Sequence, residues 1–171
     1  MSRRHAELAA ATQRLADEGI AAQWVAGDLA TPEAARQIAQ DVLALGAVDI
    51  LVNAAVITRD TTLRKMDAKQ WSDVMRVNLD SVFNLCKLLA EGMCERGYGR
   101  IVNISSVNGQ TGQFGQTNYA AAKAGMHGFT MALAREVARK GVTVNSVSPG
   151  YIRTAMTAAI PEDVKQQVLA M

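Results

Sequence analysis

Three side chains in this 171-residue sequence could together move a proton to or from a bound oxygen atom. Tyr119 and Lys123 are four positions apart, so on a helix they share one face. An ammonium beside a tyrosine favours the ionised phenol, and we therefore expect Lys123 to lower the pKa of Tyr119. A tyrosine tuned in this way can act as a general acid or base near neutral pH. Ser106 lies upstream, and its hydroxyl could hold the same substrate oxygen.

The segment before Tyr119 decides between this chemistry and the alternative of a solvated helical face. Residues 100–104 form an apolar, β-branched run of strand length, and Ser105 and Ser106 follow it directly. A glycine-bearing loop, beginning with residues 109–112, then leads into the predicted helix that carries Tyr119. In open α/β sheets, ligands bind at the carboxyl ends of the strands, which is where this pattern places Ser106.

Helices and strands alternate along the rest of the chain. The sequence predicts helices at residues 6–18, 32–45, 67–78, 81–96 and 118–140, and strands at 21–25, 48–52, 100–104 and 142–147. Thr31 followed by Pro32 is typical of a helix start, and Gly141 is typical of a helix end. This alternation predicts one α/β domain over residues 1–171, with a doubly wound parallel sheet.

The bulk composition excludes several classes of protein. Hydrophobic residues make up 49% and charged residues 20% of the chain, and the net charge is +2, so neither nucleic acid nor a membrane surface is indicated as a partner. Cys86 and Cys94 would lie about 12 Å apart along one helix, which is too far for a disulfide. His5 and His127 have no ligand partners at useful spacing, so we expect no metal site. No stretch is apolar for long enough to span a membrane, and the expected compartment is the cytoplasm.

Taken in order, these features resemble the short-chain dehydrogenase/reductase family. The matching residues are Asp28, Asn53-Ala54-Ala55, Asn78, Ser106, Tyr119, Lys123, Pro149-Gly150 and Thr154. The resemblance implies a Rossmann-like fold and a nicotinamide cofactor. Within the family, residues 57–60 and 99–119 resemble the acetoacetyl-CoA reductases, which serve polyhydroxyalkanoate synthesis. This closer resemblance implies an acyl-CoA thioester substrate. It also implies a homotetramer built through helices 81–96 and 118–140. A 3-oxoacyl-carrier-protein reductase is the alternative.

The resemblance also implies a role for each catalytic residue. Tyr119 would be the general acid in reduction, Lys123 would bind the ribose and tune the tyrosine, and Ser106 would position the carbonyl. Asn78 would hold a water that relays protons to Lys123. Taken without the resemblance, Asn78 is better explained as a polar residue that interrupts a helix and is hydrogen-bonded to the backbone.

Binding residues follow from the same resemblance. Asp28 and Leu29 would touch the adenine, although Asp28 is also a plausible turn residue. The rest of the cofactor site would comprise Asn53, Ala54, Ala55, Pro149, Gly150, Ile152 and Thr154. Arg3 and Arg4 stand where a 2′-phosphate would bind, which favours NADPH over NADH, unless they are simply a solvated basic terminus. The acyl-CoA site would comprise Gln113, Phe114, Gln116 and Tyr151.

Two departures from the family pattern are evident. The sequence contains no glycine-rich loop of the kind that holds a pyrophosphate at a helix N-terminus, and Val56 replaces a usual glycine. The resemblance therefore predicts an incomplete sheet that lacks the first strands and the last one, in a chain that is a piece of a longer enzyme. We expect such a piece to be marginally stable and inactive alone. A non-catalytic remnant of the family is a further alternative.

Overall fold

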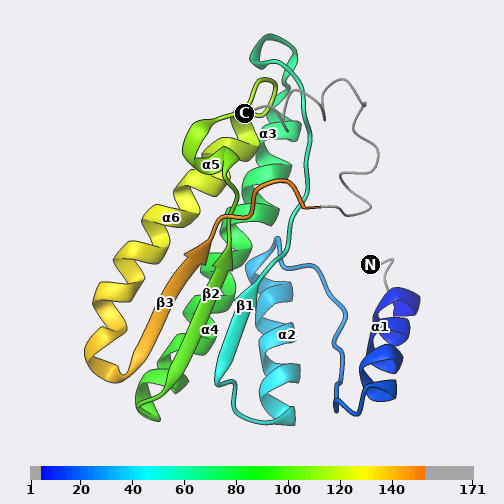
Figure 1. Ribbon diagram of the computed structural model, residues 1–171, viewed down its shortest axis with the longest axis vertical. Coiled ribbons are helices and arrows are strands. Elements are labelled where there is room, and N and C mark those ends of the chain that lie inside the picture. The colour runs from blue at the N-terminus through cyan, green and yellow to red at the C-terminus, as the bar shows by residue number, and fades with distance from the viewer. Residues whose placement is uncertain (1–4, 153–171) are drawn as a thin grey trace.

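Three parallel strands form the centre of the structure. The computed structural model describes residues 5–152. Its strands are β1 (Ile50–Asn53), β2 (Gly99–Ile104) and β3 (Val142–Val147), and they lie side by side in that order. In the register of the sheet, Asn53 is opposite Asn103, and Ile104 is opposite Val147. The three carboxyl ends therefore meet at one edge of the sheet (Figure 1).

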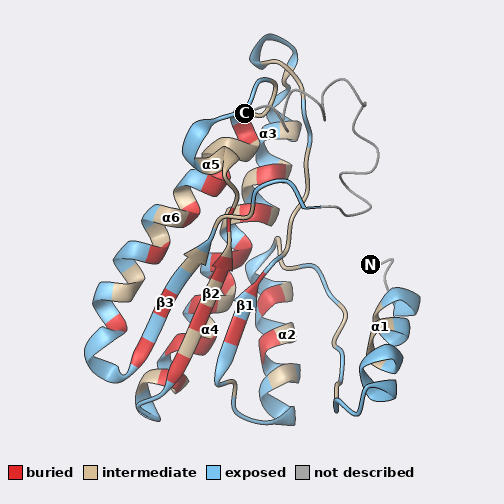
Figure 2. Ribbon diagram, viewed as in Figure 1, coloured by how far each residue is buried: buried red, intermediate tan, exposed pale blue. Residues whose placement is uncertain are grey.

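Helices cover one face of this sheet. The long helices α4 (Ser81–Glu95) and α6 (Thr117–Val137) lie behind the strands in Figure 1, and α2 (Pro32–Leu45) packs beside α4. Their apolar sides and alternate strand residues make a single core, to which the strands contribute Leu51, Ile101, Val142 and Val144. Figure 2 shows this buried layer between helices and strands.

The opposite face of the sheet is open within residues 5–152. Ile50 and Val52 on β1 are 61% and 55% exposed, and Val147 on β3 is 48% exposed. These apolar side chains alternate with the buried ones because successive strand residues point to opposite faces. The structure confirms the predicted α/β class, with parallel strands in an incomplete Rossmann-like sheet. A doubly wound sheet has a helical layer on each face, and α2, α4 and α6 form one of these layers.

Local sequence explains where several helices begin and end. The Thr31 hydroxyl accepts a hydrogen bond from the Ala34 amide at 3.3 Å and caps α2, as predicted. Gly141 ends the segment after α6 with φ at 73°, and a Cβ there would lie 2.1 Å from the Gly97 carbonyl oxygen. Only glycine fits this turn. The chain then enters β3, whose predicted bounds are confirmed.

The helix predicted at residues 67–78 differs in detail. Asp67 and Gln70 form a reciprocal capping box that starts α3 (Ala68–Met75). A π-helical turn, η2 (Arg76–Asp80), then joins α3 directly to α4. The remaining short elements are η1 (Leu63–Lys65), α5 (Asn108–Thr111) and η3 (Ala138–Lys140).

The strand predicted at residues 21–25 is wrong. This segment is irregular, because a strand requires a neighbour for its backbone hydrogen bonds and no described strand lies beside it. The preceding helix, α1 (His5–Asp17), is present as predicted but has no buried residue, and it lies apart from the sheet (Figure 1). Across the described residues, none of the helices has the length and apolar character needed to cross a membrane.

Candidate active site

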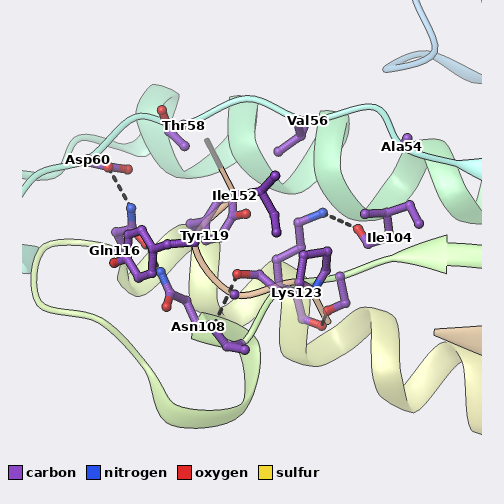
Figure 3. Close-up of a pocket in the computed structure, with 16 residues that line it drawn as sticks. Ala54, Val56, Thr58, Asp60, Ile104, Asn108, Gln116, Tyr119, Lys123 and Ile152 are labelled. Carbon is purple, nitrogen blue, oxygen red and sulfur yellow. Dashed lines mark hydrogen bonds between the residues drawn. The ribbon is translucent and has the colours of Figure 1, made fainter. Parts of the chain in front are cut away.

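A pocket lies where the three strands end. Its volume is about 560 Å³, within the usual range for a small-molecule site. The loop after β1 forms one wall, the end of β2 and the start of α6 form the second, and the segment after β3 forms the third. Figure 3 shows the side chains that converge there. The lining residues are Ala54, Val56, Thr58, Asp60, Ile104, Ser105, Ser106, Val107, Asn108, Gln116, Tyr119, Lys123, Pro149, Gly150, Tyr151 and Ile152.

The structure brings together the three side chains predicted to do chemistry. Tyr119 and Lys123 occupy adjacent turns of α6, and the lysine Nζ lies 5.8 Å from the centroid of the phenol ring. Ser106 follows β2, and the influence of its hydroxyl on Tyr119 favours the phenolate. A carbonyl oxygen in this pocket can therefore meet a phenol and an alcohol at the same time.

Lys123 is the largest fully buried side chain of the described chain, at 2% exposure. Its ammonium donates a hydrogen bond of 2.6 Å to the carbonyl of Ile104, at the carboxyl end of β2. Burial lowers the pKa of this amine to about 8, because a desolvated charge is disfavoured. The lysine thus keeps a positive charge near neutral pH while it lies against the pocket.

The expected effect of Lys123 on Tyr119 is wrong for this structure. The pKa of Tyr119 is raised rather than lowered, mainly because the phenol is desolvated, while the Ser106 hydroxyl opposes that shift. The charge of Asp60 raises it further. The phenol therefore keeps its proton near neutral pH, and the lysine ammonium points to the Ile104 carbonyl.

Asn78 is hydrogen-bonded to the backbone, as the alternative interpretation expects, and the water relay stays a prediction. Its side chain is fully buried in the π turn and exchanges two hydrogen bonds with the backbone of Ile57, at 2.8 and 2.9 Å. Both amide atoms are used, so the side chain fixes the loop after β1 against the helix. This is the backbone-bonded alternative that the sequence left open.

The predicted cofactor residues divide into two groups. Ala54, Pro149, Gly150 and Ile152 line the pocket with Tyr119 and Lys123. The other seven either do not line the pocket or lie outside the described residues. Asn53 is buried and bonds Asn103, Asp28 caps a turn by accepting from the Ala30 amide, and the Leu29 carbonyl accepts from Asn84. Ala55 is absent from the lining. Arg3, Arg4 and Thr154 lie outside the described residues.

The predicted substrate residues divide in the same way. Gln116 and Tyr151 line the pocket, whereas Gln113 and Phe114 do not, and Phe114 is 87% exposed. Phe114 is therefore exposed to solvent on its loop, although the adjacent Gly115 is bonded to Thr61.

Asp60 is a pocket residue to which the sequence gave no role. Its carboxylate accepts a hydrogen bond of 2.7 Å from Gln116, which in turn accepts one of 2.9 Å from Asn108. The Thr61 amide also bonds the Gly115 carbonyl, so the loop after β1 is tied to the start of α6 beside Tyr119 (Figure 3). Asp60 could be read directly from the sequence, but its hydrogen-bond partner Gln116 could not, because the two residues are far apart in the chain.

Comparison with known proteins agrees with the family resemblance seen in the sequence. The profile of the short chain dehydrogenase family matches residues 1–165. This chain belongs to the short-chain dehydrogenase family. It is 59% identical over 138 residues to an acetoacetyl-CoA reductase of Allochromatium vinosum, covering 81% of this chain and 56% of that protein.

Two further relatives show how far the similarity extends. An acetoacetyl-CoA reductase of Cupriavidus necator is 56% identical over 156 residues, covering 91% of this chain and 61% of that protein. A 3-oxoacyl-[acyl-carrier-protein] reductase of Vibrio cholerae is 54% identical over 125 residues, covering 73% of this chain and 51% of that protein. The chain thus spans between 51% and 61% of these two curated relatives.

Proposed function

We propose that this short-chain dehydrogenase takes part in the NADPH-dependent reduction of a 3-oxoacyl thioester, acetoacetyl-CoA to 3-hydroxybutyryl-CoA, as in polyhydroxyalkanoate synthesis. The observation that carries the proposal is the convergence of Ser106, Tyr119 and Lys123 in one pocket at the strand ends. The relatives named acetoacetyl-CoA reductase support the choice of substrate. The two free thiols among the described residues fit a reducing compartment such as the cytoplasm.

The pocket fits the nicotinamide end of the cofactor. A buried ammonium on Lys123 is suited to a ribose hydroxyl, and the opposite wall offers the backbone of Pro149 and Gly150 with the apolar Ile152. When bound, NADPH supplies a hydride to the 3-keto carbon. Arg3 and Arg4 would select NADPH over NADH by pairing with its 2′-phosphate.

The site's own residues supply the proton that balances this hydride. Ser106 donates a hydrogen bond to the keto oxygen and holds it near Tyr119. The raised pKa of Tyr119 keeps the phenol protonated, which suits a general acid in the reductive direction. Lys123, whose ammonium bonds the Ile104 carbonyl, would hold the ribose hydroxyl next to this phenol.

A chimera provides the direct test of activity. The parts of the Cupriavidus necator relative that lie outside its aligned residues would be joined to this chain. We expect the chimera to reduce acetoacetyl-CoA with NADPH and to prefer it to NADH. No oxidation of NADPH by a folded chimera would contradict the proposal.

A carrier-protein thioester is the second candidate substrate, because a relative of that name is 54% identical. Gln116 and Tyr151 line the pocket and would contact the acyl group in either case. The chimera should turn over acetoacetyl-CoA faster than the carrier-protein thioester. The reverse preference would assign the chain to the carrier-protein enzymes.

A non-catalytic remnant is the third candidate, because these 171 residues contain no glycine-rich pyrophosphate loop. We expect the chain alone to bind NADPH weakly in a calorimetric titration and to turn over nothing measurable. Tight stoichiometric binding by the chain alone would contradict this expectation. Failure of the chimera to bind NADPH would support the remnant.

We further propose a homotetramer built through α4 and α6. A groove between these helices is lined by Phe83, Phe129 and Leu133 with charged residues at its rim, and Phe83 is 50% exposed there. A glutamate at Phe83 should dissociate the chimera in sedimentation experiments, because it places a charge in an apolar contact. Phe129→Glu in the groove, or Met131→Glu on the 64% exposed Met131 of the same helix, should likewise dissociate the chimera.

A further inference from the structure

His127 joins three serine hydroxyls at the strand ends. Its Nδ1 lies 2.9 Å from the Ser146 Oγ on β3. Its Nε2 lies 3.1 Å from the Ser105 Oγ, which follows β2, and 3.3 Å from the Ser148 Oγ, which follows β3. The imidazole therefore uses both ring nitrogens, and it ties α6 to the ends of two strands.

The hydrogen bonds fix which nitrogen carries the proton. The Ser105 hydroxyl has one hydrogen, and it donates this hydrogen to the Lys123 carbonyl at 2.9 Å. Ser105 can then only accept from His127, so the Nε2 of the neutral ring must be the donor. It follows that Nδ1 is the acceptor and that Ser146 donates to it. Ser148 accepts from the same Nε2–H.

Two of the three serines adjoin the pocket, and Ser105 itself lines it. Ser105 precedes Ser106, and Ser148 precedes the wall segment 149–152. Ser105 also holds the backbone of Lys123, one turn before His127 on α6. One ring thus fixes three parts of the site relative to one another: the serine, the lysine helix and the wall after β3.

We infer that His127 is a positioning residue of this site, which rests on the reductase function proposed above. Its Nε2–H holds Ser105, and through Ser105 it sets the distance from the Ser106 hydroxyl to Tyr119. Through Ser148 it holds the wall on which the nicotinamide end of the cofactor would lie. A ring that only filled space would need neither a fixed tautomer nor a donor at Nε2.

The first test is spectroscopic and needs no activity. The 171-residue chain contains two histidines, so ¹⁵N-histidine labelling gives two sets of ring signals. We expect His127 as the Nε2–H tautomer and His5, which is exposed, as the internal reference. A ring at residue 127 with its proton on Nδ1, or averaged between both nitrogens as in a free imidazole, would overturn the inference.

The second test uses matched amide variants of the same chain. A glutamine at 127 carries its amide nitrogen at the level of Nε2, whereas an asparagine reaches only the level of Nδ1. The pKa of Tyr119, followed by ¹³C labelling of the tyrosines, reports whether the Ser106 hydroxyl still acts on the phenol. We expect H127N and H127L to raise this pKa and H127Q to restore it, with Tyr98 unchanged as the internal reference.

Equal Tyr119 titration in all three variants would show that His127 has no positioning role. Should H127L fail to fold, Ser146→Ala removes only the Nδ1 partner, and the Nε2–H tautomer is expected to persist because Ser105 still accepts from it. A proton moved to Nδ1 in Ser146→Ala would likewise contradict the network. Because neither readout uses NADPH or a thioester, failure of the reductase function would be seen in the chimera assay and not here.

Discussion

Helices α6 and α1 are buried in the structure to very different degrees. Helix α6 buries Asn118, Lys123 and Thr130, and each of them is hydrogen-bonded to a loop or strand outside the helix. Helix α1 has no buried residue. Leu15 near its end is 38% exposed, and the segment that follows pairs with no strand.

This difference matches the two halves of the proposed cofactor site. The residues that would act on the carbonyl lie on α6 and the ends of β2 and β3, where buried hydrogen bonds fix their geometry. The residues predicted for the adenosine half, Asp28 and Leu29, lie on the largely exposed segment between α1 and α2, where Asn84 of α4 donates one hydrogen bond to the Leu29 carbonyl. The residues proposed to act on the carbonyl are thus fixed by more buried contacts than the residues proposed to bind the adenosine.

Removing the phenol hydroxyl should give the largest effect. Tyr119→Phe in the chimera should lower turnover by about 10²–10⁴-fold, because no other described group is placed to protonate the keto oxygen. Tyr98→Phe is the control, since Tyr98 is exposed and lies outside the pocket. Near-normal turnover by the Tyr119 variant would remove this residue from its role.

Core truncation should affect the two regions unequally. Ile101→Ala on β2 should lower the free energy of unfolding by about 2–5 kcal/mol, because the side chain is fully buried between the strands and helices. Leu15→Ala on α1 should change it by about 0.5 kcal/mol or less. Urea denaturation of the chain measures both. Equal losses would show that α1 is packed as firmly as the sheet.

The buried lysine should make stability rise with pH. The pKa of Lys123 is about 8 in the folded chain, against 10.5 for an ordinary lysine. Between these values the unfolded chain binds the extra proton, so the free energy of unfolding increases with pH across this window. Lys123→Met should remove that rise. Thermal melts of both proteins from pH 7.5 to pH 10 test it, and parallel curves would contradict the assigned burial.

The smallest expected effect is at the pocket wall after β1. Val56 lines the pocket, and a glycine there would let a ligand approach the backbone more closely. The NADPH affinity of the chimera should improve by a modest factor from valine to alanine to glycine. Calorimetry measures the series. An unchanged affinity would mean that Val56 does not crowd the cofactor.

Much of the fold followed from local sequence. Thr31 and Pro32 predicted the start of α2, and the β-branched run after Gly141 predicted the bounds of β3. Both predictions were possible because capping and strand preference act over a few residues. The irregular segment at 21–25 could not be predicted in this way. A strand forms only with a neighbour, and the presence of a neighbour is a property of the whole fold.

The candidate site shows the same division. The sequence by itself determined that Ser106, Tyr119 and Lys123 belong together, since helical spacing and the end of a strand are local features. Only the tertiary structure decided that burial raises the pKa of Tyr119, that the Lys123 ammonium bonds Ile104, and that His127 links three serines. These properties depend on desolvation and on partners from distant segments, which no short stretch of sequence specifies.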